Sequence, residues 1–257
     1  MSPQFNCILC LVYIDLVGTV ARCYSIIHCT FCCHSPQLNC ETDFVARTAQ
    51  FQSLVAELTR SIAEAADLRD SAFTETFRTN PTKLGPAGEH KSVSDAIVHA
   101  VGQLSENIVL SNGCLVEVEE GIVTSYVYNN VHQSQVPLDV IEMGVGTFVS
   151  LVHLRPCKDC TLPSSEIVKL GRLIGQHVVG TDPSSVSSEE EKEERAASSP
   201  LLTQSFLFDA SVTVGEMLKR SGVEVLGFTR HGLREEERVV IDRTSAFSVT
   251  FSSTSQQ

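Results

Sequence analysis

The sequence predicts an α+β fold with two subdomains, each a small antiparallel sheet packed with helices. Segments with helical periodicity separate short runs of β-forming residues, and these runs are too few and too short for a doubly wound parallel sheet. The chain has 257 residues, of which 42% are hydrophobic and 19% charged, so it can form an ordinary globular core. We expect a Cys-rich, poorly ordered segment at 1–37, subdomains at 38–142 and 143–234, a mobile acidic linker at 181–205 and a tail at 235–257.

Two helices are predicted in the first subdomain. From Thr42 to Ala66, apolar residues recur every three or four positions, which indicates a helix with one buried face. Residues 80–88 contain prolines and glycines and predict a loop. Ser92 and Asp95 then form a capping pattern that predicts the start of a second helix.

Strands and helices alternate through the rest of the chain. Alternating polarity and β-forming residues predict strands at 115–119, 122–128 and 146–154. The remaining predicted elements are a helix at 164–180, a short strand at 206–208, a helix that begins with the capping box Thr213–Glu216 and ends at Gly222, and a strand at 223–229.

The net charge of the chain and the absence of common catalytic motifs exclude several classes of function. A formal net charge of -12 argues against a surface that binds nucleic acid, because such affinity comes mainly from clustered Lys and Arg. The sequence has no phosphate-binding Gly-x-x-x-x-Gly-Lys-Ser/Thr loop, no Gly-x-Ser-x-Gly elbow and no His-Glu-x-x-His helix. We therefore predict no enzyme, no cofactor and no direct contact with nucleic acid; a protein partner or a small ligand is favoured.

Six of the ten cysteines lie before residue 38. The pairs Cys7-x-x-Cys10 and Cys29-x-x-Cys32 have the spacing of a four-thiolate zinc site. The segment between them is apolar and has no Gly-containing knuckle, so we predict no metal site. A zinc- or membrane-associated interaction module built on this segment is kept as an alternative function.

The first 37 residues match no targeting pattern. Asp15 and Arg22 interrupt the apolar run, which falls short of the roughly 20 residues that span a membrane. Neither a secretory signal nor a mitochondrial presequence is visible. We expect this segment to be foreign to the domain, for example a misassigned exon or a retained intron.

Asp43 and Phe44 stand side by side immediately before the first helical run. A helix that begins there would present a carboxylate and a phenyl ring together, as a surface for contact with another protein. From these residues alone the other interpretation is favoured: Phe44 as a core anchor and Asp43 as a cap for free N–H groups.

The segment Asn39–Arg47, Asn-Cys-Glu-Thr-Asp-Phe-Val-Ala-Arg, resembles the signature of the elongation factor Ts family. The resemblance covers about residues 38–234, closely follows the mitochondrial members, and has a short acidic linker where bacterial relatives carry a helical hairpin. Further matching segments follow in the family order: Leu104–Ile108, Ser125–Val127, Gln176–Val178 and Thr213–Gly215.

The resemblance implies an elongation factor Ts core-like fold and a guanine-nucleotide exchange factor for elongation factor Tu, in its GDP-bound or nucleotide-free form. It implies that Asp43 and Phe44 enter the partner's G domain, where the ring separates two helices and disturbs the magnesium and phosphate contacts. Thr42 and Val45 are implied as supporting residues. It also implies location in the mitochondrial matrix, with no direct nucleic-acid or membrane contact.

The chain also departs from the family pattern. The family begins with a small helical module and a strand pair leading into the signature, and residues 1–37 match neither. We expect His34–Gln37 to be unable to form the usual strand, which would leave part of the first sheet unpaired. An exchange-deficient truncated product is therefore a further alternative.

Overall fold

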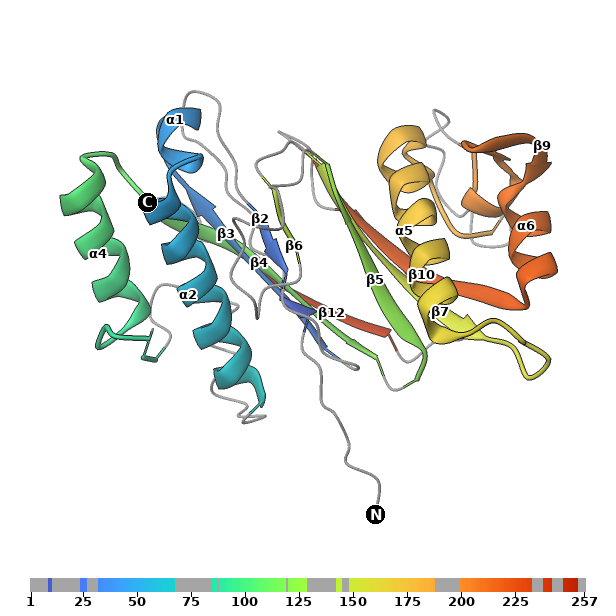
Figure 1. Cartoon of the computed structure of the whole chain (residues 1–257), viewed down its shortest axis with the longest axis horizontal. Helices are drawn as coiled ribbons and strands as arrows, with labels where there is room; N and C mark the ends of the chain where they lie inside the picture. The colour runs from blue at the N-terminus through green and yellow to red at the C-terminus, as the bar shows by residue number, and fades with distance from the viewer. Residues whose placement is uncertain are drawn as a thin grey trace, which may run out of the picture. The chain divides into compact units, whose positions relative to one another are not determined.

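The computed structural model shows an α+β protein made of two compact units, which confirms the predicted fold class (Figure 1). Unit 1 draws on residues 1–117, 127–147 and 248–257, and unit 2 on 118–126 and 148–247. The division places residues 122–126 of the strand at 122–127 in unit 2, whereas the sequence-based limits placed this strand in 38–142. The structure describes residues 9–10, 24–26, 32–67, 85–86, 88–118, 120–128, 142–144, 148–187, 199–232, 238–241 and 247–253.

Unit 1 is built on a sheet with the strand order β1-β3-β4-β12. β1 runs parallel to β3, and β3 runs antiparallel to β4. A separate antiparallel pair joins β2 to β6. The elements of this unit are β1 (Leu9–Cys10), β2 (Tyr24–Ile26), β3 (Cys32–Asn39), α1 (Asp43–Ala46), α2 (Ala49–Asp67), α4 (Val93–Leu104), β4 (Val109–Val118), β6 (Glu142–Gly144) and β12 (Phe247–Ser253).

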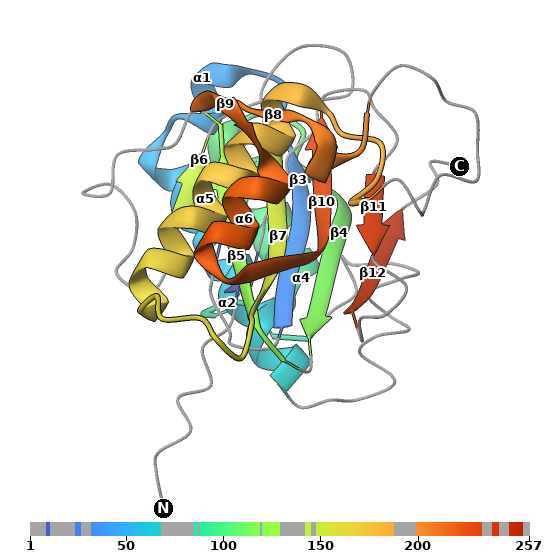
Figure 2. The same ribbon diagram turned by 90° about the vertical axis from the view of Figure 1, so that its right-hand side faces the viewer.

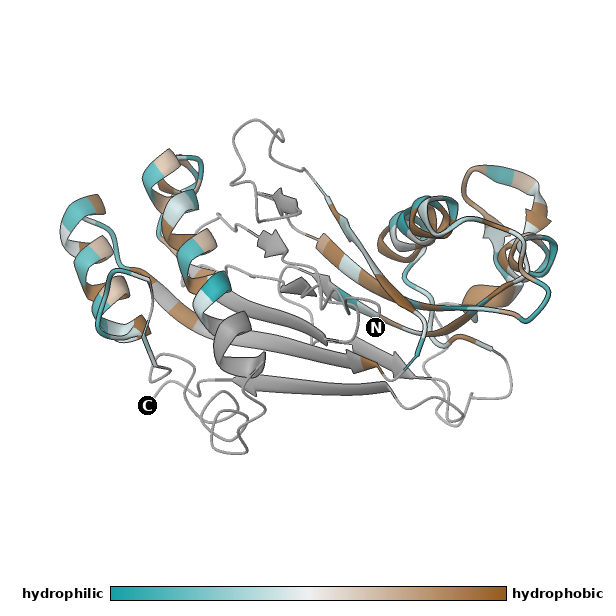
Figure 3. Ribbon diagram, turned by 60° about the horizontal axis from the view of Figure 1, so that its bottom comes forward, coloured by the Kyte–Doolittle hydropathy of each residue, from teal (hydrophilic) through white to brown (hydrophobic). Residues whose placement is uncertain are grey.

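The helices α2 and α4 of unit 1 each bury one face. Phe51, Val55 and Leu58 of α2 are fully buried, and α4 buries Val93 and Ile97. Hydrophobic and hydrophilic residues alternate around both helices in Figure 3, as expected of helices that pack on one side. α2 packs against both α4 and β3, so its apolar face joins the helices to the sheet.

The cap predicted for the second helix is confirmed. The Ser92 hydroxyl accepts a hydrogen bond from the backbone N–H of Asp95 at 3.1 Å. The helix ends at Ser105, whose backbone is left-handed with φ 57° and whose N–H donates to the carbonyl of Val101. This abrupt end fixes the direction in which the chain leaves α4.

The expectation that His34–Gln37 would not form a strand was wrong. These residues lie inside β3, which pairs antiparallel with β4 from Cys32 to Asn39. Pro36 has no N–H to donate, but the described residues of β1 pair with β3 at Cys33 and His34, so the proline lies beyond that paired stretch. The strand that precedes the signature is therefore present, with an irregularity in its register just before Leu38.

Unit 2 is built on a four-stranded sheet with the order β11-β10-β7-β5. β10 lies between β7 and β11 and runs antiparallel to both. α5 and α6 lie on the same face of this sheet (Figure 2). The elements are β5 (Ile122–Val127), β7 (Phe148–Pro156), α5 (Ser164–Thr181), η4 (Leu201–Thr203), β8 (Ser205–Phe206), β9 (Asp209–Thr213), α6 (Val214–Ser221), β10 (Val223–Gly232) and β11 (Arg238–Ile241).

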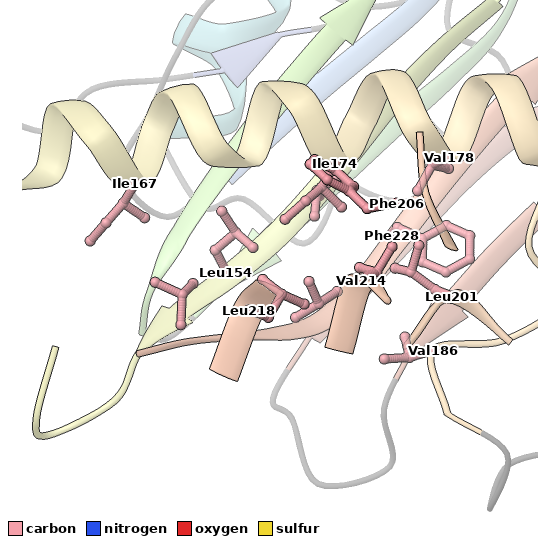
Figure 4. Packing of buried hydrophobic residues seen from close by; sticks show 13 residues of the cluster. Leu154, Ile167, Ile174, Val178, Val186, Leu201, Phe206, Val214, Leu218 and Phe228 are labelled. Carbon is pink, nitrogen blue, oxygen red and sulfur yellow. The ribbon is translucent and has the colours of Figure 1, made fainter. Parts of the chain in front are cut away.

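The core of unit 2 lies between α5 and the sheet (Figure 4). Ile174 and Val178 of α5 point toward Phe228 of β10, and all three side chains are fully buried. Gly171 and Gly175 let the helix approach closely: a Cβ on Gly171 would lie 2.2 Å from Thr124 Oγ1, and one on Gly175 2.9 Å from Ser150 Oγ. Larger residues at either position would push the helix off the sheet.

The second capping pattern predicted from the sequence is also confirmed. Thr213 Oγ1 accepts from the N–H of Glu216 at 3.2 Å, and the Glu216 carboxylate accepts from the N–H of Thr213 at 3.0 Å. The helix α6 that follows ends at Gly222, with φ 63°. This is a complete capping box within four consecutive residues.

Two expectations concern irregular segments. The acidic middle of the linker expected at 181–205 lies outside the described residues, at 188–198. The described ends of this segment are held in the unit 2 core, because Val186 and Leu201 are buried there and the Leu201 N–H donates to the Ser185 carbonyl at 2.8 Å. The segment expected to be a tail, 235–257, contributes two strands to the sheets: β11, paired with β10, and β12, next to β4. These short strands have no strong pattern in the sequence and are stabilised by pairing, β11 with the preceding strand β10 and β12 with the distant strand β4.

No helix in the described ranges is long and apolar enough to cross a bilayer.

Candidate functional site

The candidate site is the turn formed by α1 in unit 1. Thr42 is its N-cap, with extended backbone angles of φ -134° and ψ 152°, and its hydroxyl accepts from the N–H of Val45 at 3.3 Å. α1 is only four residues long, and Arg47 ends it. A helix this short has little stability of its own, so its orientation depends on its contacts.

The sequence predicted one helix from Thr42 to Ala66, and the structure corrects this to two. The break falls at Thr48, whose hydroxyl donates to the carbonyl of Val45 at 2.7 Å and accepts from the N–H of Phe51 at 3.2 Å. A threonine side chain that bonds to nearby backbone competes with continuous helix. α1 is thereby set apart from α2.

Phe44 is exposed on this turn. Its side chain is 79% accessible to solvent, whereas Ala46 and Phe51 are fully buried (the position of α1 can be followed in Figure 1). The interpretation of Phe44 as a core anchor is therefore wrong, because Ala46 and Phe51 occupy the buried positions. A phenyl ring this exposed on an anchored turn has the properties of a contact residue for another protein.

Asp43 stands next to Phe44 in the first turn of α1. Its carboxylate lies 3.6 Å from Arg47 Nε, and both side chains are about half exposed, at 46% and 58%. The cap of α1 is Thr42, so Asp43 is not needed for that role. The turn therefore presents a carboxylate, a guanidinium and a phenyl ring together.

A residue outside the predicted site holds the start of this turn. The Glu106 carboxylate accepts from the N–H of Glu41 at 3.1 Å, from the N–H of Thr42 at 3.0 Å and from the Thr42 hydroxyl at 2.5 Å. Glu106 lies in one of the segments that match the family, but no local pattern indicated its partner. Only the fold brings it to Thr42.

Cys40 belongs to the support of the turn. It is buried, and its thiol donates to the carbonyl of Thr42 at 3.4 Å. Burial raises the pKa of this thiol to about 12, with smaller contributions from Glu106 and Asp43. The group stays neutral at physiological pH and acts in packing, not as a nucleophile or a metal ligand.

The described residues hold no cluster of three or more His, Cys, Asp and Glu side chains that could bind a metal ion. Of the proposed zinc ligands, Cys7 and Cys29 lie outside those residues. Cys157 and Cys160 are free thiols in a turn in which the Cys160 N–H donates to the Cys157 carbonyl at 2.9 Å.

Unit 2 contains a cavity of about 580 Å³. Its lining includes Arg155 and Glu224, but these pair with one another at 2.9 Å, and Arg155 also pairs with Glu120 at 2.7 Å. Arg155 and Glu224 thus satisfy one another instead of converging on a ligand. We therefore place the candidate site on the α1 turn.

The exposed α1 turn is the candidate contact surface of this α+β fold, and comparison with known proteins gives the family of the chain. A family model described as "Elongation factor TS" matches residues 41–199, a range that begins at Glu41 and includes the whole α1 turn. The chain therefore belongs to the elongation factor Ts family.

Similar proteins are described as "Elongation factor Ts, mitochondrial". The protein from Bos taurus is 34% identical over 209 residues, which cover 78% of this chain and 59% of that protein. The protein from Homo sapiens is 32% identical over 207 residues, covering 78% and 62%, and that from Rattus norvegicus is 31% identical over 210 residues, covering 79% and 62%. The chain thus spans about six-tenths of the length of these relatives.

Proposed function

We propose that this chain is a guanine-nucleotide exchange factor that promotes the release of GDP from elongation factor Tu, so that GTP can bind again. The observation that carries the proposal is the 79% exposed ring of Phe44 on a turn held by Glu106, inside the part of the chain that matches the family. Its partner is elongation factor Tu, GDP-bound or nucleotide-free.

In this proposal Phe44 and Asp43 enter the partner, and Thr42 and Val45 support them. Full burial of a phenylalanine side chain is worth about 1.5–3 kcal/mol. That energy is available to stabilise a partner conformation in which the nucleotide site is disturbed. A coupling of about 1–3 kcal/mol already changes affinity roughly 5- to 150-fold.

Linkage explains why no covalent chemistry is needed. If binding of the factor weakens GDP by some ratio, GDP weakens the factor by the same ratio. The chain would act as an exchange factor and not as an enzyme, with no cofactor or metal of its own. The net charge of -12 supports action without direct nucleic-acid contact.

The mitochondrial matrix is the proposed location. The support is the description of the relatives from Bos taurus and Homo sapiens as mitochondrial proteins. A fluorescent-protein fusion of the native transcript, imaged with a matrix marker, tests this; exclusion from mitochondria would contradict it.

The function is tested by the release of fluorescent GDP from mitochondrial elongation factor Tu. The full chain should accelerate release, and Phe44→Ala should reduce the acceleration by about tenfold or more, because an interface anchor of about 2 kcal/mol or above is lost. Val98→Ala is the matched control, since Val98 is also an exposed apolar residue of unit 1, at 69%.

Three results are informative. Loss of acceleration in Phe44→Ala but not in Val98→Ala supports the proposed role of Phe44 as a side chain that enters the partner. Equal rates for Phe44→Ala and the parent chain would contradict that role. A parent chain that leaves the rate of GDP release unchanged would overturn exchange activity itself, in favour of an exchange-deficient product.

A further inference from the structure

Glu106 occupies a fixed position at the end of α4. Ser105, immediately before it, adopts the left-handed backbone with φ 57°, and its N–H donates to Val101 at 2.9 Å. The chain reverses there and brings the Glu106 carboxylate to the residues that precede α1. The contact joins positions 64 residues apart in the sequence.

The three hydrogen bonds to Glu106 constrain the approach to α1. They fix two successive backbone N–H groups, those of Glu41 and Thr42, together with the Thr42 hydroxyl. The hydroxyl in turn accepts from the N–H of Val45. One carboxylate therefore determines the backbone direction on the N-terminal side of Phe44 and the rotamer of the residue that caps the turn.

At the other end, α1 is tied to α2. The side-chain amide of Gln52 donates to the carbonyl of Arg47 at 3.4 Å, and Thr48 links the two helices as described above. With both ends held, the four-residue helix has little freedom to rotate. The Phe44 ring projects from the middle of it.

We propose that Glu106 is the positioning residue of the exchange site: its carboxylate sets the orientation in which Asp43 and Phe44 are presented. This inference rests on the proposed exchange function and assigns a role to a residue that does not touch the partner's nucleotide. Glu106 acts through Thr42. The exposed ring of Phe44 makes the contact with the partner, and Glu106 sets the orientation of that ring.

A carboxylate suits this contact better than an amide, because all three partners of Glu106 are donors. Both oxygens of Glu106 are used: Oε2 by the two backbone N–H groups and Oε1 by the Thr42 hydroxyl. In Glu106→Gln one of these oxygens becomes an NH₂ group, which can only donate. If this NH₂ group faces the Thr42 hydroxyl, the hydroxyl can rotate and accept a hydrogen bond from it. If it faces the two backbone N–H groups, three donors meet and no hydrogen bond can form. The variant keeps the shape of the side chain and loses charge-assisted bonds.

The experiment compares the full chain with Glu106→Gln, Thr42→Val and the double variant, in fluorescent-GDP release over a range of factor concentrations. Glu166→Gln is the matched control, because it makes the same change on an exposed helix face of unit 2. In Glu106→Gln the maximal rate of GDP release should fall about tenfold, while the half-saturating concentration stays within about twofold. In this inference Glu106 changes the orientation of the contact residues and not their identity, so affinity should change less than rate.

The double variant tests whether the two residues act through one contact. Because the Thr42 hydroxyl donates to Glu106, the double variant should lose less than the product of the two single losses. Multiplicative losses would overturn the inference. So would an unchanged maximal rate in Glu106→Gln when the parent chain is active and Phe44→Ala is impaired.

A second measurement needs no partner. In amide hydrogen exchange, the Glu41 and Thr42 N–H groups should exchange at least about tenfold faster in Glu106→Gln, while α2 amides keep the parent protection and show that the unit is folded. Unchanged protection at Glu41 and Thr42 overturns the inference whatever the release assay gives. A parent chain inactive in release, with these amides deprotected in the variant, would reject the exchange function and retain the positioning contact.

Discussion

The helices α1 and α6 begin with the same cap and differ in what completes it. Thr213 begins α6, and Glu216, three residues later, returns a carboxylate to the N–H of Thr213. Thr42 begins α1, but the third residue after it is Val45, and the carboxylate that accepts from the Thr42 N–H comes from Glu106. The cap of α6 is therefore local, because its carboxylate lies in the same helix, and the cap of α1 is tertiary, because its carboxylate comes from a residue distant in the sequence.

The difference explains how an exposed aromatic can be held firmly. A local capping box would place a glutamate on α1 itself, next to Phe44. Because the carboxylate comes from Glu106, after the end of α4, the chain keeps Val45 at that position and Phe44 stays exposed beside it. The turn is then only as well oriented as the packing of α4 against α2 allows.

The largest expected effect is a difference in stability between removing the buried ring of Phe51 and removing the exposed ring of Phe44. Phe51→Ala should lower the free energy of unfolding of unit 1 by about 3–5 kcal/mol, because Phe51 is fully buried and its removal leaves a cavity. Phe44→Ala should change it by less than about 0.5 kcal/mol, because Phe44 is exposed. Amide hydrogen exchange of α2 measures both. A comparable loss in the two variants would show that Phe44 packs in the core.

The second prediction compares the two caps. Glu106→Ala should destabilise unit 1 by about 1–2 kcal/mol, since three donors lose an ionised acceptor in a partly exposed place. Glu216→Ala should destabilise unit 2 by about 0.5–1 kcal/mol, since one backbone donor is released to solvent. Hydrogen exchange of α2 and α5 amides gives the two values. If Glu216→Ala costs more, the tertiary cap is the weaker of the two.

Of these two caps, one could be predicted from the sequence and the other could not. The box at Thr213–Glu216 was predictable because its partners lie within one helical turn. The bond from Thr42 to Glu106 was not, since it depends on how α4 ends and packs. The same holds for Pro36 in β3, where local propensity argued against a strand that pairing with β4 stabilises, and for the exposure of Phe44, which the helical pattern alone did not favour.

The third prediction converts the tertiary cap into a local one. In the Glu106→Ala background, Val45→Glu places a carboxylate three residues after Thr42, as in α6. It should restore about 0.5–1 kcal/mol of the stability of unit 1. It should not restore GDP release, because it replaces Val45 beside Phe44. Val98→Glu in the same background is the control for added charge. Recovery of release would mean that stability of α1, and not the identity of its surface, limits exchange.

The smallest expected effect concerns the ion pair on α1. Arg47→Ala removes a contact of 3.6 Å between side chains that are both about half exposed, so unit 1 should lose no more than about 0.5 kcal/mol. Lys169→Ala, which removes the exposed pair with Glu166 on α5, is the matched control in unit 2. Hydrogen exchange at 0.05 M and 0.5 M salt should show both small losses shrinking as salt screens the charges. A loss above about 1 kcal/mol for Arg47→Ala alone would mean that α1 is held by its own side chains after all. The contrast with α6 would then lie in the strength of the local contacts and not in the distance of the capping carboxylate.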